Sequence, residues 1–215
     1  MPLDIKICGL STPEMIAAAL DGGASHVGFI FFPKSPRNVT PQQAAELRKA
    51  ATGRAKAVAV TVDATDEFLD AVVSAMRPDM LQLHGKETPE RVARVRERFN
   101  LPVMKALSVS EPADLLPIQG FVGVADRLLL DAKAPAGSEL PGGNGVSFDW
   151  RLLAALDPGL DYMLSGGLNP GNVAEAIRIA HPPGLDVSSG VESAPGVKDI
   201  ALIEAFFAAV RRAVS

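Results

Sequence analysis

Eight short apolar runs recur along this chain at nearly even intervals, and this repeat limits the possible folds more than any other feature. The runs are rich in β-branched residues and lack clean polar alternation, which predicts strands that are covered on both faces. Their starts give a repeat of about 26 residues, close to the smallest βαβ unit. The expected strands are Ile5–Cys8, His26–Phe31, Ala57–Val62, Met80–Leu83, Val103–Leu107, Arg127–Leu130, Tyr162–Leu164 and Leu185–Val187.

Between these runs lie segments with helical patterns. Four of them begin with a side-chain oxygen for the N-cap and a proline for the first helical position. These starts are Thr12-Pro13, Thr40-Pro41, Thr88-Pro89 and Asn169-Pro170. The last segment has apolar residues at helical spacing, which predicts a buried stripe. The stripe consists of Ile203, Phe206, Phe207, Val210 and Val214.

Strands that alternate with helices predict an α/β protein, and no linker or shift in composition divides residues 1–215. Eight such units favour a single (β/α)8 barrel, the TIM barrel, which typically takes ~200–250 residues. The alternative is a doubly wound open sheet. That fold usually has a Gly-rich first turn, and no G-x-G-x-x-G follows the first expected strand, so we expect the barrel.

The composition excludes several classes of partner. A formal net charge of −4 provides no basic surface for a nucleic acid, and no apolar run is long enough to span a membrane. The single cysteine and the lack of a signal-peptide pattern at the N-terminus predict a cytoplasmic protein. The short loops and acidic surface favour a monomer over a homodimer.

In a (β/α)8 barrel the chemistry lies at the carboxyl ends of the strands. Two expected strands end in Gly-containing turns, at the positions where this fold often binds phosphate. These turns contain Gly166, Gly167, Ser188, Ser189 and Gly190. The alternative is that the glycines only turn the chain. Two such turns at both positions favour a phosphate site.

Cys8 and Asp131 are the candidate acid–base groups, because each ends an expected strand. A lone cysteine is often only a small buried hydrophobe, but Cys8 falls at the catalytic end. Gly9 should leave room for a ligand, and the helix after Thr12 should favour the thiolate. Asp131 could instead cap a nearby N–H. At the mouth of one barrel, the two side chains would flank a single substrate.

Other polar residues have a less specific interpretation. His84 follows the fourth strand, but three histidines without clustered carboxylates do not predict a metal site. Lys105 should lie in the barrel interior, neutralised by a carboxylate. The Gly- and Pro-rich segment 132–147 is longer than ordinary loops, so we expect it to form a lid over the site.

Seven segments, taken in order, resemble the phosphoribosylanthranilate isomerase family of tryptophan biosynthesis over essentially the whole length. They are KICGL, GFIFFPKSPRNV, LQLHG, LLLD, GGNGVSFDW, LSGGLNPGNV and LDVSSGVESAPGVKD. Departures from the family pattern fall at Thr61, Asn144, Val146 and Ser165. They affect loop contacts more than the residues that carry acid, base or phosphate-binding roles.

The resemblance implies a role for individual residues. Cys8 matches the general base and Asp131 the general acid, Arg37 the substrate-binding arginine, and Asp186 a polar group near the substrate's amine. His84 is also assigned to substrate binding. The implied reaction is an Amadori rearrangement of a phosphorylated aminofuranose, an aldose–ketose isomerisation by proton transfer that needs no cofactor and no metal.

Three rivals are weaker. A histidine-pathway isomerase would have an aspartate at the position of Cys8 and a second Gly-rich phosphate turn. A pentose-phosphate epimerase would need a metal cluster. A non-catalytic barrel that senses a phosphorylated metabolite would have no reason to keep both Cys8 and Asp131.

Overall fold

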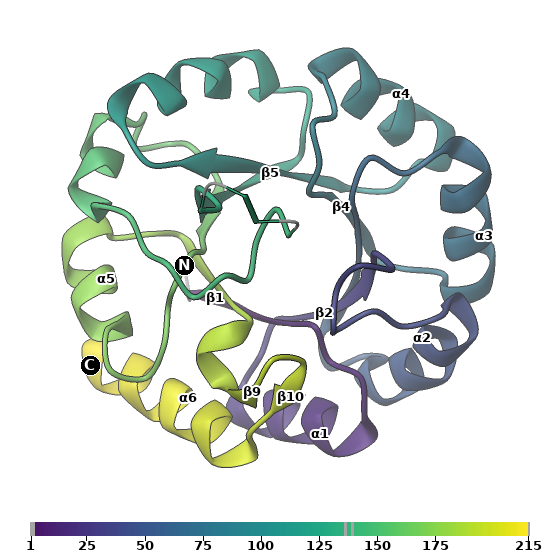
Figure 1. Cartoon of the computed structure of the whole chain (residues 1–215), viewed down its shortest axis with the longest axis horizontal. Coiled ribbons are helices and arrows are strands. Elements are labelled where there is room, and N and C mark those ends of the chain that lie inside the picture. Colours follow the sequence, from purple (N-terminus) through teal and green to yellow (C-terminus); the bar gives the residue numbers. More distant parts are fainter. Residues whose placement is uncertain (1–2, 136, 139, 215) are drawn as a thin grey trace.

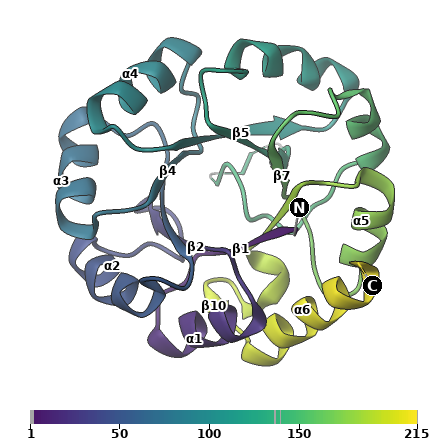
Figure 2. The same ribbon diagram turned by 180° about the vertical axis from the view of Figure 1, so that it is seen from behind.

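A computed structural model describes residues 3–135, 137–138 and 140–214. Within them, eight parallel strands close into a barrel in chain order, which confirms the predicted barrel and excludes the open sheet. Helical segments surround the strands, as the two opposite views show (Figures 1 and 2). The strands are β1 (Asp4–Cys8), β2 (His26–Phe31), β3 (Lys56–Thr61), β4 (Met80–Leu83), β5 (Val103–Val109), β6 (Arg127–Ala132), β7 (Tyr162–Leu164) and β8 (Gly184–Val187).

The strands are buried on both faces, as their apolar composition predicts. Side chains that point inward fill the barrel interior, and those that point outward pack under the helices. The interior cluster consists of Cys8, Val58, Val60, Met80, Met104, Ala106, Leu129 and Met163. Lys6, Asp131 and Asp186 are also buried at strand positions, so charged groups lie next to this apolar interior.

Three threonine caps start helices where the sequence predicts them. The side chains of Thr12, Thr40 and Thr88 each accept a hydrogen bond from a backbone N–H in the first turn. Thr65 caps a further helix in the same way. The helices are α1 (Pro13–Gly22), α2 (Pro41–Arg48), α3 (Asp66–Met76) and α4 (Pro89–Phe99).

The fourth predicted start, Asn169-Pro170, is wrong by one turn, because α5 (Val173–Ala180) begins three residues later. The Asn169 side chain accepts a hydrogen bond from Gly171 N at 2.8 Å, which forms a local Asx turn. Asn172 then becomes the N-cap residue, and its own side chain bonds back to Asn169 N and Gly167 O.

The connections after β5 and β6 contain 3-10 helices, η2 (Pro112–Phe121) and η3 (Trp150–Ala155). Pro117 lies inside η2 and removes a backbone donor, which disfavours an α-helix. The last helix, α6 (Ile200–Val214), buries its predicted stripe except Val214, which is 57% exposed at the helix end. No helix among the described residues is long and apolar enough to cross a membrane.

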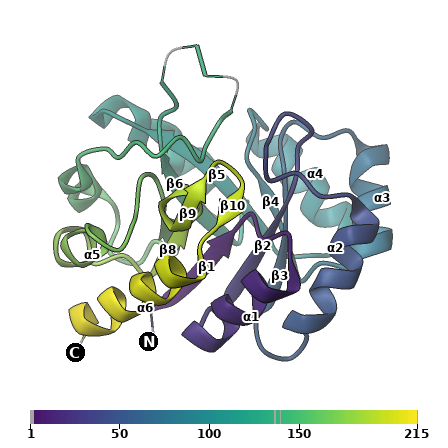
Figure 3. The same ribbon diagram turned by 60° about the horizontal axis from the view of Figure 1, so that its bottom comes forward.

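Besides the loop after β2, two segments at the carboxyl ends of the strands are important for the site (Figure 3). One is the loop after β6, in which Ala136 and Glu139 lie outside the described residues. The other follows β8, where a short 3-10 helix, η4 (Ser189–Val191), leads into two antiparallel strands, β9 (Glu192–Ala194) and β10 (Val197–Lys198). We call these two strands the β9–β10 hairpin.

Candidate active site

One cavity opens at the carboxyl ends of the barrel strands, and it brings together most of the residues predicted for the site. Its lining includes Cys8, Arg37, His84, Asp131, Gly166, Gly167, Asp186, Ser188 and Ser189. Gly190 is the exception. A Cβ at Gly190 would lie 1.8 Å from Leu168 O, so a glycine is required where this turn packs against the backbone of Leu168.

Cys8 ends β1 and is 5% exposed. Burial raises the pKa of its thiol. The charges of Lys6 and Lys198 act in the opposite direction, but the net shift is upward. Burial therefore acts against the thiolate, and the expectation that the following helix favours the thiolate stays a prediction. A glycine faces the sulfur, since a Cβ on Gly28 would lie 2.9 Å from Cys8 Sγ.

Asp131 lies near the end of β6 and is 4% exposed. Its Oδ1 accepts a hydrogen bond from Ala132 N at 2.9 Å. One of its two oxygens therefore caps a backbone N–H, as the alternative interpretation of this residue predicted. Its Oδ2 lies 3.3 Å from His84 Nε2. His84 Nδ1 is in turn 2.8 Å from Gln82 Nε2, so β4 orients the imidazole beside the acid.

Arg37, in the loop after β2, is buried and bound to a carboxylate of the protein itself. Its Nε and Nη2 donate to the two carboxylate oxygens of Glu192 at 2.7 and 2.8 Å. A Cβ on Gly9 would lie 2.7 Å from Arg37 Cδ. The space beside Gly9, which we expected a ligand to use, is filled by the Arg37 side chain.

Asp186, on β8, forms a buried ion pair within the barrel. Its Oδ1 accepts a hydrogen bond from Lys6 Nζ at 2.8 Å, and its Oδ2 accepts one from Ser165 Oγ at 3.1 Å. The carboxylate therefore lines the cavity with both oxygens already oriented. Ser165, one of the departures from the family pattern, supplies one of these contacts.

The two Gly-containing turns have packing reasons of their own. Gly166 and Gly167 have φ of 91° and 62°, a region that favours glycine. A Cβ on Gly166 would lie 2.5 Å from Ala132 N. The Ser188 hydroxyl is used within the protein, because it donates to Cys8 O at 3.1 Å.

The loop after β6 reaches the acid and the arginine directly. A Cβ on Gly142 would lie 2.4 Å from Asp131 Oδ2, and one on Gly143 would lie 2.8 Å from Arg37 Nη1. Described residues of this loop line the cavity together with the strand ends. The consecutive glycines thus let the loop approach both side chains closely.

Lys105 does not lie in the barrel interior as predicted. Its neighbours on β5, Met104 and Ala106, point inward, so Lys105 points to the outer face. There it pairs with Glu87 at 2.7 Å and also donates to Gly85 O. The predicted neutralising carboxylate is present. Among the described residues, no cluster of three or more His, Cys, Asp or Glu side chains could hold a metal ion.

Sequence reasoning assigned no role to Lys6, Gln82, Glu192 or Lys198. The sequence contains a signal that could have linked Glu192 and Lys198 to each other. Their opposite charges flank Pro195-Gly196, a pair typical of a turn, and a hairpin there would place the two side chains together. Nothing in the local sequence indicates that Glu192 binds Arg37.

Known proteins resemble this chain over almost its whole length. The family model described as N-(5'-phosphoribosyl)anthranilate (PRA) isomerase matches residues 5–209. The chain belongs to this family. An N-(5'-phosphoribosyl)anthranilate isomerase of Mesorhizobium japonicum is 71% identical over 213 residues, which cover 99% of this chain and 97% of that protein. This chain is accordingly an isomerase of tryptophan biosynthesis.

Solved structures of family members share the fold. Monomers generated from the dimeric phosphoribosylanthranilate isomerase of Thermotoga maritima match with a TM-score of 0.85 and 33% identity over 98% of this chain and 100% of theirs. Another PRA isomerase structure, solved with reduced 1-(o-carboxyphenylamino)-1-deoxyribulose 5-phosphate, matches with a TM-score of 0.85 and 32% identity over the same shares.

Proposed function

We propose that Cys8 and Asp131 are the general base and general acid of the isomerisation. The observation that carries this assignment is their placement. Both are buried at the carboxyl ends of strands and line the same cavity, and Asp131 also has an orienting partner in His84. The ligand bound by the family structure carries a carboxyphenyl group and a phosphate, so the substrate of this enzyme presents an anionic group at each end.

The chemistry requires two placed proton transfers. Asp131 protonates the ring oxygen of the aminofuranose, which breaks the bond between that oxygen and C1 and leaves an iminium ion. The Cys8 thiolate then removes the proton from C2, and the electron pair of that bond neutralises the iminium to form an enolamine. Tautomerisation gives the ketose. Placed acids and bases contribute on the order of 10²–10⁴-fold each.

The remaining lining residues bind the substrate. Arg37 faces the anionic aminobenzoate end, and Asp186 and His84 contact the polar groups near the amine. The turns Gly166-Gly167 and Ser188-Ser189-Gly190 hold the phosphate through backbone N–H groups. Within the second turn, Gly190 allows the close approach to the backbone of Leu168. The loop after β6 closes over the bound substrate and excludes water.

Three further assignments belong to this proposal. Residues 1–215 act as one barrel domain, and the enzyme works as a monomer although a related family member is dimeric. The reduced lone cysteine suits a cytoplasmic location. The reaction needs no metal or cofactor.

The test is steady-state kinetics of the purified chain on phosphoribosylanthranilate, with and without a metal chelator. We expect Cys8→Ala and Asp131→Asn each to lower kcat by about 10²-fold or more, since each removes one proton transfer. Chelator should leave the rate unchanged. A kcat within about tenfold of wild type for either variant would show that the acid–base pair is wrongly assigned. Assaying the histidine-pathway substrate in parallel tests the nearest rival.

A further inference from the structure

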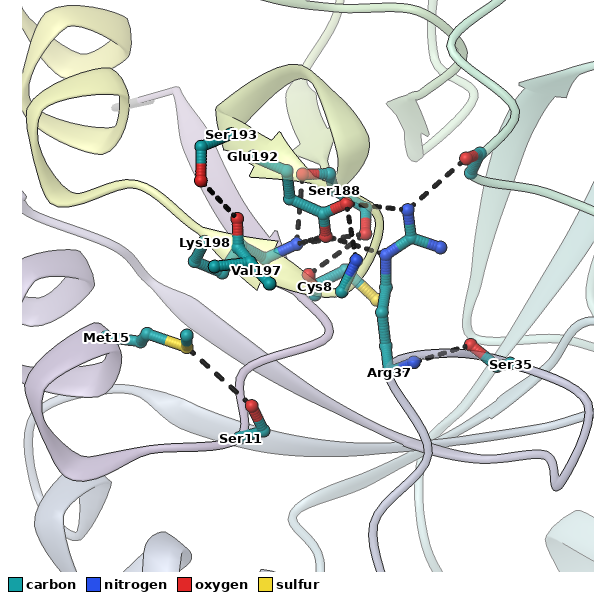
Figure 4. Close-up of polar contacts among 12 residues, drawn as sticks. Cys8, Ser11, Met15, Ser35, Arg37, Ser188, Glu192, Ser193, Val197 and Lys198 are labelled. Atoms are coloured by element: carbon teal, nitrogen blue, oxygen red, sulfur yellow. Dashed lines mark hydrogen bonds and ion pairs between the residues drawn. The ribbon is translucent and has the colours of Figure 1, made fainter.

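Arg37 does not stand alone at the cavity, because Glu192 and Lys198 of the β9–β10 hairpin form a buried network with it (Figure 4). Glu192 receives both bonds from Arg37 and a third from Lys198 Nζ at 2.6 Å. A fourth comes from Gly196 N at 3.1 Å. The side chains of Arg37, Glu192 and Lys198 are 5%, 3% and 0% exposed.

The network continues to the strand that bears Cys8. Lys198 Nζ also donates to Ser188 O at 3.0 Å and Ser188 Oγ at 3.3 Å. Ser188 Oγ in turn donates to Cys8 O. The hairpin therefore holds the arginine at one end and the turn after β8 at the other.

The charges in this network leave Arg37 able to attract an anion. Arg37 and Lys198 share one carboxylate, so the network retains one net positive charge while Lys198 is protonated. Burial lowers the pKa of Lys198, and the charge of Glu192 opposes this shift. Burial by itself raises the pKa of Glu192, but the hydrogen bond from Arg37 and the charge of Lys198 lower it overall, which keeps the side chain ionised. Bidentate pairs of this kind fix the plane of a guanidinium as well as its position.

We propose that Glu192 is a positioning residue that holds the Arg37 guanidinium in the orientation that binds the carboxylate end of the substrate. The bonds to Glu192 occupy Nε and Nη2, Nη2 also donates to Gly143 O at 3.4 Å, and Nη1 lies on the side of Gly143 in the cavity-lining loop. Without Glu192 the guanidinium would have other rotamers available. This proposal rests on the substrate-binding role assigned to Arg37 above.

A substitution that removes the charge of Glu192 distinguishes positioning from simple neutralisation. If Glu192 only neutralises Arg37, Glu192→Gln removes the negative charge beside the guanidinium and should lower KM for this anionic substrate. If it positions Arg37, the same change should raise KM. The two roles therefore predict opposite signs.

The experiment measures kcat and KM for Arg37→Ala, Glu192→Gln, Glu192→Asp, the double variant Arg37→Ala/Glu192→Gln and Ser193→Ala. We expect Glu192→Gln to raise KM about tenfold with kcat within about threefold of wild type. Glu192→Asp keeps the charge and should recover part of the loss. The double variant should be no worse than Arg37→Ala alone, because Glu192 acts through Arg37. Ser193→Ala, exposed on the same hairpin, is the control.

Competitive inhibition by the two ends of the substrate separates a local effect from general loosening of the fold. In Glu192→Gln the inhibition constant of 2-aminobenzoate should rise with KM, whereas that of inorganic phosphate should stay within about twofold. An unchanged or lowered KM, full additivity in the double variant, or an equal loss for both inhibitors would overturn the positioning role. If Arg37→Ala itself leaves KM unchanged, the substrate-binding assignment of Arg37 fails first, and the inference fails with it.

Discussion

Cys8 is the only cysteine in the chain, so its titration can be followed without interference. A thiol in an apolar interior resists ionisation, and the ammonium of Lys6 offsets this only in part. As a general base Cys8 must be deprotonated, which makes the reaction sensitive to pH in the range where the thiol titrates.

We expect the rate at which iodoacetamide alkylates Cys8 to rise by about tenfold per pH unit from neutral pH upward, because the raised pKa leaves few molecules with a thiolate. Cys8→Ser is the control for alkylation at other sites. A plateau of this rate already below pH 8 would mean that the surroundings of Cys8 favour the thiolate.

At the scale of elements, the loop after β6 and the β9–β10 hairpin decide how the strand-end residues are used. Glu192 of the hairpin binds the Arg37 guanidinium, and the loop after β6 approaches Arg37 and Asp131 at the cavity. The loop comes this close only because two successive residues, Gly142 and Gly143, have no side chain.

Gly142→Ala should lower kcat/KM by about tenfold or more, because the new Cβ would displace either Asp131 or the loop. Gly142 does not have a positive φ, so the effect would be steric. Gly145→Ala is the matched control. It strains the backbone of the same loop at φ 72°, but its nearest neighbour, Ser189 Oγ, is 4.0 Å away. Equal losses in the two variants would indicate backbone strain and not contact with the acid.

At the scale of the whole molecule, the two ends of the barrel have different roles. His26 begins β2, at the end away from the cavity. Its ring is buried, with Nδ1 2.8 Å from Ser25 Oγ and Nε2 without a hydrogen-bond partner. Burial lowers the pKa of His26 from 6.5 to about 4. We therefore expect His26 to affect the stability of the fold and not the rate of the catalysed reaction.

Between pH 6.5 and 4 the unfolded chain binds a proton at His26 that the folded chain does not bind, so the free energy of unfolding should fall as the pH falls. The contribution of this group is about 2–3 kcal/mol. Urea unfolding of wild type and His26→Gln at pH 7 and pH 4.5 measures it. The variant should lose less stability on acidification, and equal losses would show that His26 titrates normally in the fold.

The sequence by itself was sufficient for the strands, the barrel and three of the capped helices, because apolar patterning and capping are local properties of the chain. It also predicted that Cys8 and Asp131 lie at the same end of the barrel, since strand ends in this fold converge at one mouth, and both line one cavity. The local sequence at Asn169-Pro170 is compatible with a helix N-cap and with an Asx turn. The structure has the turn, so the predicted helix start was wrong.

Only the tertiary structure decided which side chains meet. Arg37 and Glu192 are 155 residues apart, and Lys6 and Asp186 are 180 residues apart, so closure of the barrel alone brings these pairs together. The upward pKa shift of Cys8 depends on burial of the thiol in the folded protein. The Arg37 side chain fills the space beside Gly9 only because the packed chain brings the two together. Burial and long-range pairing are properties of the packed chain, and no local pattern encodes them.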